Sequence, residues 1–424
     1  MRKKNLKNNI ACCVVILCCI VSGGIIASCA NEEEKTVQVN SEISYLLDKD
    51  ENQLVVEIPC LQSWTITGAE EWCVPSITSG QGKTSVSIQV EANSGEDIRK
   101  CWLSAVSEDA RHIIKITQYG DERTILPIVF HVLYTDPNDS RQYLNADYLA
   151  ELLEVANGCY MGKFGGVDLE VKLVLATETP TGGTLATPGV NYVYRENAVM
   201  DCHTFMYDNS RQYAQLLWDP NRYINVMCYP FLPDGRENVI LLGSSHFPFT
   251  NPDTYLPELP TISSPYLGLE NLRYPHCISM NSSYIYSESM RYTLAHELGH
   301  YLGLYHVFSE GDDEMCIDSD FCDDTPSYNR EDYLRYIEWA EQNLSPGKYL
   351  YELWMRESCD GEQFRSVNVM DYNDGARNQF TADQRARVRH VLRYSPLLPT
   401  ERNARIQRSS LHDGPLDLPI VVMD

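Results

Sequence analysis

Near the N-terminus, short apolar segments rich in Val and Ile alternate with polar, turn-forming stretches. The clearest apolar segments are residues 54–58, 85–90 and 113–118, each of strand length. Turn residues such as Ser79-Gly80-Gln81-Gly82 separate them. This pattern predicts a small all-β sandwich over residues 36–120.

After residues 120–122 the pattern of apolar positions changes. Residues 126–134 have the character of a strand, and residues 145–161 repeat apolar side chains on one face of a helix. Because this helix lies between two strands, we expect a mixed α/β (α+β) unit over residues 121–398, with a C-terminal tail at 399–424. Further predictions are strands at 167–176, 222–229 and 276–286, a loop region rich in Pro, Gly and Ser at 230–275, and a helical insertion at 329–357.

The clearest chemical signal lies at the end of a second helical pattern. Residues 287–295 carry apolar side chains at helical spacing and lead into His296-Glu297-Leu298-Gly299-His300. His296 and His300 are four residues apart, so both imidazoles lie on one helix face. Gly303 can take the left-handed turn that ends the helix and directs His306 to the same point. Three histidine nitrogens leave the fourth tetrahedral position of Zn²⁺ to water, which predicts a catalytic zinc site.

Glu297 lies beside the first of these histidines, where it reaches a zinc-bound water rather than the metal. We expect Glu297 to take a proton from that water, and the resulting hydroxide to attack the scissile carbonyl. Glu297 then passes the proton to the leaving amine. The alternative is a helix that carries three histidines by chance. The motif therefore predicts a zinc-dependent endopeptidase that hydrolyses peptide bonds.

The order of motifs resembles that of the metzincin zinc metalloproteases and, among them, the pappalysin family. The histidine motif is followed by Asn368-Val369-Met370-Asp371-Tyr372, which resembles the methionine turn of these enzymes. The likeness covers residues 122–398 and implies a metzincin-like catalytic domain. Other segments that resemble the pappalysin family are the strand at 126–134, Asp323-Asp324-Thr325-Pro326 and Phe380-Thr381-Ala382-Asp383-Gln384.

The resemblance implies roles for further residues. Met370 would form the floor of the metal site without binding the metal, and Tyr372 would support the tetrahedral intermediate. The strand at 276–286 would be the sheet edge on which an extended substrate lies antiparallel. Such an edge has unpaired N–H and C=O groups that can bind a peptide backbone whatever its side chains.

Around the methionine turn, the resemblance also bears on disulfides and specificity. It favours a pairing of Cys359 with Cys316 or Cys322, whereas Arg377 stands at about the place where relatives often carry another cysteine. One class of relatives prefers basic side chains through an aspartate in this region. Asp374 is one residue away from that position and Arg377 adds positive charge, so we predict that a strong arginine preference is absent.

Acidic side chains crowd residues 310–324, where eight of fifteen positions are Asp or Glu. Carboxylate oxygens suit calcium, and some pappalysin relatives bind calcium here. The spacing does not match the calcium loop of EF-hands, so a solvated acidic loop without a metal is the alternative. Zn²⁺ is thus the expected cofactor, and Ca²⁺ is a second candidate.

Residues 1–28 have the pattern of a secretion signal, with basic residues followed by an uncharged apolar segment at 10–26. Ile26-Ala27-Ser28-Cys29 resembles a bacterial lipobox, in which Cys29 becomes the lipidated first residue; ordinary cleavage near Ser28 is the alternative. The acidic tether at 29–35 resembles surface-export signals of Bacteroidetes lipoproteins, or is a solvated linker. We expect an exported protein, lipid-anchored to the outer membrane at the cell surface, with a periplasm-facing anchor as the competing arrangement.

The predicted sandwich resembles a BACON domain, a family associated with carbohydrate or mucin binding. Glycan binding is therefore an expectation for residues 36–120. Trp64 and Trp72 could stack on sugars, but core positions are the favoured interpretation because a small sandwich needs large apolar side chains. The residues that carry the resemblance are Trp64, Trp72, Val86 to Val90, Asn93, Arg99 and Gln118-Tyr119-Gly120.

The formal net charge of −25 limits the choice of partners. Nucleic acid is excluded, because binding it needs a basic face that neutralises phosphates and none is visible. The expected partners are a protein or peptide substrate and a membrane contacted through the lipid anchor. The competing function is a glycan- or mucin-binding surface lipoprotein with a metzincin fold that does not cut.

Overall fold

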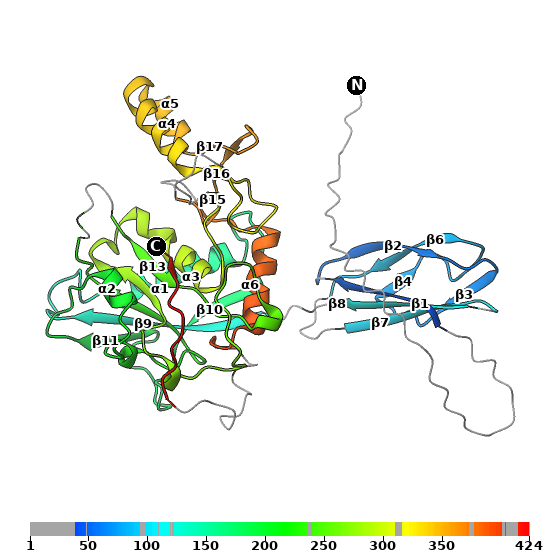
Figure 1. Cartoon of the computed structure of the whole chain (residues 1–424), viewed down its shortest axis with the longest axis horizontal. Coiled ribbons are helices and arrows are strands. Elements are labelled where there is room, and N and C mark those ends of the chain that lie inside the picture. Colours follow the sequence, from blue (N-terminus) through cyan, green and yellow to red (C-terminus); the bar gives the residue numbers. More distant parts are fainter. Residues whose placement is uncertain are drawn as a thin grey trace. The chain divides into compact units, whose positions relative to one another are not determined.

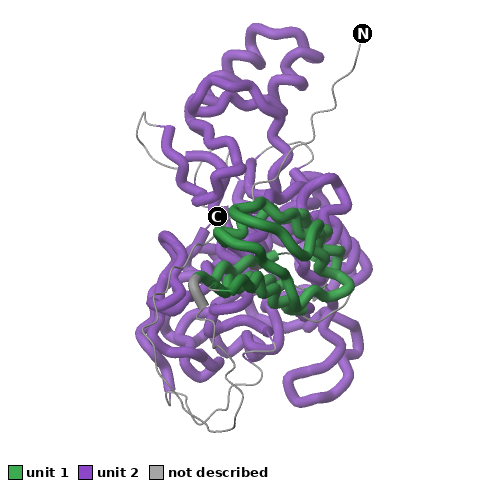
Figure 2. The backbone as a smooth tube through the Cα atoms, turned by 90° about the vertical axis from the view of Figure 1, so that its right-hand side faces the viewer, with its two compact units in different colours: residues 1–122 green, residues 123–424 purple. Residues whose placement is uncertain are grey.

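The chain divides into two compact units, residues 1–122 and residues 123–424 (Figure 2). The predicted signal, Cys29, the acidic tether and Asp374 lie outside the residues that the structure describes. The computed structural model describes residues 39–423 except 48, 94–98, 109, 119, 121–122, 234, 236–239, 310–315, 373–376, 401–402 and 404–413.

The first unit is a small all-β sandwich, as the strand pattern predicts. One sheet has the strand order β1-β8-β7-β3-β5 and the other has the order β2-β6-β4. Trp64 is 2% exposed and lies in the core, where its indole N–H donates to the carbonyl of Gly82 at 3.0 Å. The strands are β1 (Val39–Leu47), β2 (Asn52–Ile58), β3 (Ser63–Thr67), β4 (Cys73–Pro75), β5 (Ser79–Gln81), β6 (Thr84–Val90), β7 (Arg99–Val106) and β8 (Arg111–Gln118).

The second unit is mixed α/β and is built on a sheet of order β10-β9-β12-β14-β13-β19 (Figure 1). Strands β10, β11 and β12 all run parallel to β9, and β14 runs parallel to β12. Strand β13 is antiparallel to β14, and β19 is antiparallel to β13. The strands are β9 (Thr124–Tyr134), β10 (Val171–Leu175), β11 (Val190–Tyr194), β12 (Ile224–Tyr229), β13 (Gly243–His246), β14 (Ile278–Asn281) and β19 (Val422–Met423).

Strand β9 is the long central strand of this sheet, and burial on both faces explains its apolar sequence. Ile128 and Phe130 belong to the larger core cluster of the unit. Val129 and Leu133 belong to two separate, smaller clusters. Helix α1 (Ala146–Tyr160) covers the larger cluster with the leucines that the helical period places on one face. The predicted fold class, an α/β unit preceded by a β-sandwich, is therefore confirmed.

Helix α3 (Thr293–Tyr301) carries the histidine motif and follows β14 through a 3-10 turn at Glu288–Tyr292. The lead-in at 287–295 is thus only partly α-helical. Helices α4 (Arg330–Asn343) and α5 (Pro346–Glu352) are the predicted insertion and project from the unit as a helical hairpin (Figure 1). Within the described part of the chain, no helix is both long and apolar enough to cross a membrane. The other elements are α2 (Cys202–Met206), α6 (Ala382–Tyr394), β15 (Phe308–Ser309), β16 (Tyr328–Asn329), β17 (Met355–Glu357) and β18 (Gln363–Arg365).

Two predictions about the sheet are wrong. The segment at 276–286 contributes only the four residues of β14, which is enclosed between β12 and β13 and is not a sheet edge. The antiparallel strand next to it, β13, lies within residues 230–275, which the sequence predicts as loop. Its sequence, Gly-Ser-Ser-His, contains no large apolar or β-branched residue, although all four residues are buried.

Candidate active site

The three histidines of the motif meet at one point inside the second unit. The Nε2 atom of His300 lies 3.1 Å from Nε2 of His296 and 3.1 Å from Nε2 of His306, and the remaining pair is 3.2 Å apart. All three side chains are at most 3% exposed. Helix α3 supplies His296 and His300 from one face, and the turn at Gly303, with φ of 91°, returns the chain so that His306 joins them.

Hydrogen bonds at the other ring nitrogens fix the chemical state of two histidines. Nδ1 of His296 lies 2.7 Å from the carbonyl oxygen of Val369, and Nδ1 of His300 lies 2.7 Å from that of Leu304. A carbonyl only accepts, so each Nδ1 carries the proton and each Nε2 presents a lone pair. Burial, reinforced by the neighbouring imidazoles, holds the pKa of His296 and His300 well below the usual histidine value, which keeps both rings neutral.

This arrangement fits a tetrahedral metal ion. Nitrogens bound to one zinc ion at about 2.0–2.1 Å would lie about 3.3 Å from one another, close to the separations of 3.1–3.2 Å in this site. Lone pairs that converge so closely repel each other unless a cation lies between them. Among the described residues, these histidines are the one cluster of three or more His, Cys, Asp or Glu side chains close enough to hold an ion.

The segment predicted as a methionine turn lies directly beneath α3. A Cβ on Gly299 would lie 2.4 Å from Sδ of Met370, so this helix position must lack a side chain for the methionine to approach. Val307 donates its backbone N–H to the carbonyl of Met370 at 3.3 Å. Together with the bond from His296 to Val369, this contact ties the turn to the first and third histidines.

Tyr372 lies beside the histidines, as the resemblance implies. The centroid of its ring is 4.6 Å from that of His306 and 5.4 Å from that of His296. The guanidinium of Arg330, the first residue of α4, lies 4.8 Å from the ring centroid of Tyr372. The helical insertion therefore contacts the site, which its amphipathic pattern did not indicate.

A buried arginine anchors the methionine turn from below, and sequence reasoning missed it. Arg356 on β17 is 1% exposed; its Nε lies 3.5 Å from a carboxylate oxygen of Asp371, and one terminal nitrogen donates to the carbonyl of Tyr372 at 3.1 Å. Tyr328 donates its hydroxyl to Asp371 at 2.5 Å, and the hydroxyl of Ser366 also contacts this carboxylate. An arginine in a short strand gives no sequence signal for such a role, because its partner is fifteen residues away.

Glu297 is 2% exposed and lies against strand β13. A Cβ on Gly243 would come within 2.5 Å of a carboxylate oxygen of Glu297, so the glycine allows the strand to pass directly over the glutamate. At the other end of the strand, the ring of Phe247 stacks on Tyr305 at 4.6 Å and meets His300 edge-on at 5.7 Å. Strand β13 therefore spans the histidine site.

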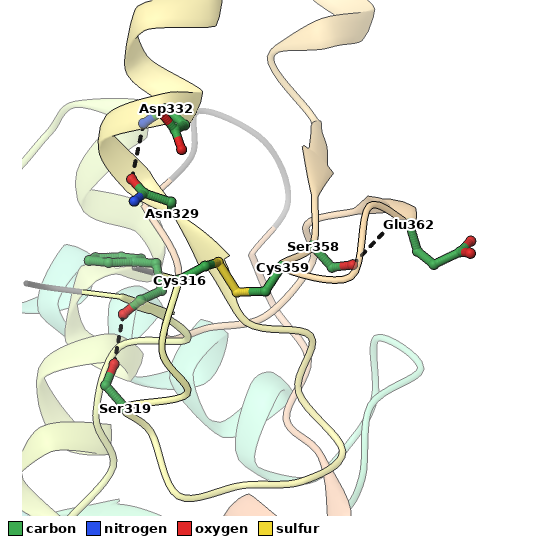
Figure 3. The surroundings of a disulfide bond; sticks show 8 residues. Cys316, Ser319, Asn329, Asp332, Ser358, Cys359 and Glu362 are labelled. Atoms are coloured by element: carbon green, nitrogen blue, oxygen red, sulfur yellow. Dashed lines mark hydrogen bonds between the residues drawn. A yellow bond between two sulfur atoms is a disulfide. The ribbon is translucent and has the colours of Figure 1, made fainter. Parts of the chain in front are cut away.

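A disulfide joins Cys316 to Cys359 at the base of the insertion (Figure 3). It is one of the two pairings that the resemblance favours, and Cys322 is buried without a disulfide. Nearby, Asn329 caps α4 by accepting the backbone N–H of Asp332 at 3.1 Å. The disulfide between Cys316 and Cys359 thus links the loop before α4 to the segment after β17, on either side of the insertion.

Two carboxylates in the described part of the acidic segment accept hydrogen bonds from neighbouring groups of the protein. Asp320 accepts the hydroxyl of Thr325 at 2.7 Å and the backbone N–H of Cys322 at 3.0 Å. Asp324 accepts two backbone N–H groups from the first turn of α6. Burial, with neighbouring Asp318, raises the pKa of Asp320 to about 7. Calcium binding stays a prediction, and residues 310–315 lie outside the described part.

Sequence comparisons relate the segment that carries this site to known metalloproteases. Residues 261–393 match the family Peptidase M43, described as pregnancy-associated plasma protein-A. That span contains all three histidines, Glu297, Met370 and Tyr372. It corresponds to about the C-terminal half of the region at 122–398 that resembles the pappalysin family.

Fungal proteins named extracellular metalloprotease match a longer region. One from Arthroderma otae is 29% identical over 171 residues, which are 39% of this chain and 49% of the relative. One from Arthroderma benhamiae is 26% identical over 268 residues, which are 61% of this chain and 69% of the relative. The chain thus spans about half the length of the first of these relatives.

Among solved structures, mature mirolysin from Tannerella forsythia, determined with a cleaved peptide, matches 63% of this chain and 90% of its own, with 20% identity and a TM-score of 0.41. The sequence matches and the histidine triad support a metalloprotease. Such a protein requires a metal, usually zinc, at the triad.

Proposed function

We propose that this protein is a zinc-dependent endopeptidase of the metzincin type, similar to the pappalysin family. The observation that carries the proposal is the convergence of three Nε2 atoms, 3.1–3.2 Å apart, beside the buried carboxylate of Glu297. A structural zinc site would use four protein ligands, whereas three ligands leave a position for water and substrate.

Each residue of the site has a distinct task in peptide hydrolysis. Zinc, when bound to His296, His300 and His306, supplies Lewis-acid activation of water and of the scissile carbonyl. The carboxylate of Glu297 accepts the proton of the attacking water and then donates it to the leaving amine. Tyr372 lies beside the histidine rings, where its hydroxyl can stabilise the developing negative charge.

The substrate is a protein or peptide bound in extended form. Strand β13 is antiparallel to its neighbour in the sheet and passes directly over Glu297, so we assign to it the backbone pairing with substrate that the resemblance places on 276–286. Arg377 is buried, and its guanidinium donates to the carbonyl of Asp371, next to Tyr372, and to that of Ser289. Its positive charge opposes basic substrate side chains, so cleavage profiling on a proteome digest should show no strong arginine preference.

The deciding experiment compares the full chain with Glu297→Gln. The variant keeps the three nitrogen ligands but cannot accept the proton, so zinc content measured by mass spectrometry should stay near one per chain. Cleavage of a casein substrate should fall by about a thousandfold or more. Glu288→Gln, which changes an exposed glutamate before α3, is the matched control and should cleave normally. Unchanged cleavage by Glu297→Gln would overturn the mechanism.

The place of action is a separate proposal. The relatives named above are described as extracellular, which supports export. We infer lipidation at Cys29 and display on the outer face of the outer membrane, with the sandwich, a BACON-like domain that binds glycans, next to the anchor. Cys29→Ala should release the protein from membranes. Resistance of the catalytic unit to protease shaving of intact cells, with digestion after permeabilisation, would contradict surface display.

A further inference from the structure

The C-terminal segment of the second unit lies along the strand that borders the metal site. Residues 422–423 form β19, which pairs antiparallel with β13 so that Met423 lies opposite Ser245 and Val422 opposite His246. Just before this pair, Phe247 donates its backbone N–H to the carbonyl of Val421 at 3.0 Å. Figure 1 shows the segment, in red, reaching β13 close to α3.

Strand β13 would be the last strand of the sheet on this side if β19 were removed. Its free edge would then present N–H and C=O groups beside the histidine site, because Gly243 contacts Glu297 and Phe247 contacts His300. Such an edge binds an extended peptide through its backbone. The C-terminal segment therefore lies in the position that we assign to a substrate.

The direction of the segment is also that of a substrate. A peptide antiparallel to β13 runs from the level of Phe247 toward Gly243, and β19 runs in this direction. Beyond Met423, the next positions along the edge are Ser244 and Gly243, where Glu297 lies. Residues that pair with 245–247 therefore precede the scissile bond.

Side chains of the segment alternate between two cores in the manner of a bound strand. The even-numbered apolar residues pack against a cluster that includes Phe249 and Tyr274, whereas Val421 and Met423 pack against the core that contains Phe247 and Met370. The intervening Pro415, Asp417 and Pro419 are exposed. The even-numbered apolar residues are Leu416, Leu418, Ile420 and Val422.

Few hydrogen bonds hold the segment to the unit outside the strand pair. Leu416 donates its backbone N–H to the carbonyl of Asn271 at 2.9 Å, and the side-chain amide of Asn271 donates to the carbonyl of Gly414 at 2.9 Å. Tyr274 donates its hydroxyl to the carbonyl of Pro419 at 3.1 Å. No residue from 414 to 423 is fully buried. A two-residue strand with half-buried side chains belongs to the least stable part of a fold, so it can open without unfolding of the unit.

We propose that residues 414–423 are a built-in inhibitor that occupies the substrate strand of the active site on the side before the scissile bond. This inference rests on the proposed function. Because the segment is covalently attached, its effective concentration at β13 is on the order of millimolar, and an external peptide must displace it. The expected consequence is a raised KM with little change in kcat, because a bound substrate meets an intact metal site.

The test compares the full chain with a variant that lacks residues 420–424. The deletion removes the pairing with β13 and keeps the contact of Leu416 with Asn271. KM for an extended peptide substrate should fall about tenfold while kcat stays within about twofold. Met423→Pro, which removes one backbone donor of the strand pair, should lower KM in the same direction. Asp417→Ala, on the exposed side of the segment, should behave like the full chain. An unchanged KM in both the deletion and the proline variant would overturn the proposal.

A binding measurement separates this inference from the proposed function. The probe is a fluorescein-labelled peptide with the sequence of residues 414–423, added to Glu297→Gln chains with and without residues 420–424. Fluorescence anisotropy should show binding to the truncated chain at least about tenfold tighter than to the complete one. Equal affinity for the two chains would refute the built-in inhibitor even if both parent proteins cleave substrate. If no variant cleaves any substrate, the proposed function fails, and the anisotropy result still decides whether the segment occupies a peptide-binding edge.

Discussion

The histidine site and the edge of β13, to which we assign substrate binding, are neighbours, but the fold constrains the histidines far more than the strand that covers this edge. The three imidazoles are buried, and two are oriented by hydrogen bonds of 2.7 Å to backbone carbonyls. The edge of β13 is covered by a strand of two residues that are only half-buried. Fixed ligands lower the cost of arranging the transition state, whereas an edge must open for each substrate. The contrast predicts that mutations at the two places will change different kinetic constants.

The largest expected effect follows from removing a ligand. His300→Ala takes away the nitrogen that is 3.1 Å from both other Nε2 atoms. Two remaining ligands bind zinc far more weakly, so zinc content and turnover should both fall by about a thousandfold or more at limiting metal. His203→Ala is the control, because His203 is exposed and stacks on Tyr207 away from the site. Peptide binding at the edge of β13 should survive this change. If the chain that lacks residues 420–424 and carries His300→Ala no longer binds the labelled peptide in the anisotropy assay, the edge and the metal site are not separable.

Sequence alone reached the metal site because that site is local. The helical period and one glycine turn bring His296, His300 and His306 together, so their separation in space follows from their spacing in the sequence. The sandwich strands and α1 could be predicted for the same reason, since each follows a short-range pattern of apolar residues. The Cys316–Cys359 bond needed the family resemblance, because sequence spacing does not determine which cysteines pair.

The edge of β13 that we assign to substrate could not be predicted in this way, because β13 and β19 come from distant segments of the sequence. Strand β13 lacks an apolar pattern, and the two residues of β19 are too short to give one. Arg356 was missed for a related reason: its burial depends on Asp371 and Tyr372 across a tertiary contact. Pattern reading recovers local geometry, whereas sheet order and buried ion pairs depend on contacts between segments.

The second-largest effect is expected where the two regions touch. In Gly243→Ala the new methyl group would lie within 2.5 Å of a Glu297 carboxylate oxygen, so the carboxylate must move. Displacing the proton acceptor should lower kcat by about 10- to 100-fold while zinc content stays unchanged. Gly347→Ala is the control, because a methyl group there meets no atom within 4 Å. A change in KM alone would mean that Gly243 serves only the substrate edge.

A smaller effect on turnover is expected from the support beneath the site. Arg356→Met leaves the Asp371 carboxylate buried without its cation and removes the donor to the carbonyl of Tyr372. The free energy of unfolding should fall by about 3–5 kcal/mol, as it does when one partner of a buried ion pair is removed. kcat should fall several-fold because Tyr372 is less firmly placed. Arg365→Met on β18, where the side chain is exposed, is the control for thermal unfolding and for kinetics. A change in KM without a change in kcat would mean that Arg356 supports substrate binding at the edge of β13 rather than the metal site.

The smallest effect on turnover is expected at Asp320, whose change should alter only the pH dependence of stability. With a pKa near 7 in the folded chain and about 3.9 when unfolded, Asp320 keeps its proton more tightly in the fold, so stability is lost as the pH rises from about 4 through 7. Asp320→Asn resembles the protonated acid and should raise the melting temperature at pH 8, with little change at pH 3 and turnover within about twofold. Asp318→Asn, at the exposed neighbour, is the matched control and should give a smaller gain. Bound calcium would reverse the sign, because an ion favours the charged carboxylate. A loss of stability in Asp320→Asn at pH 8 that appears only when calcium is added would therefore show that this loop binds the ion.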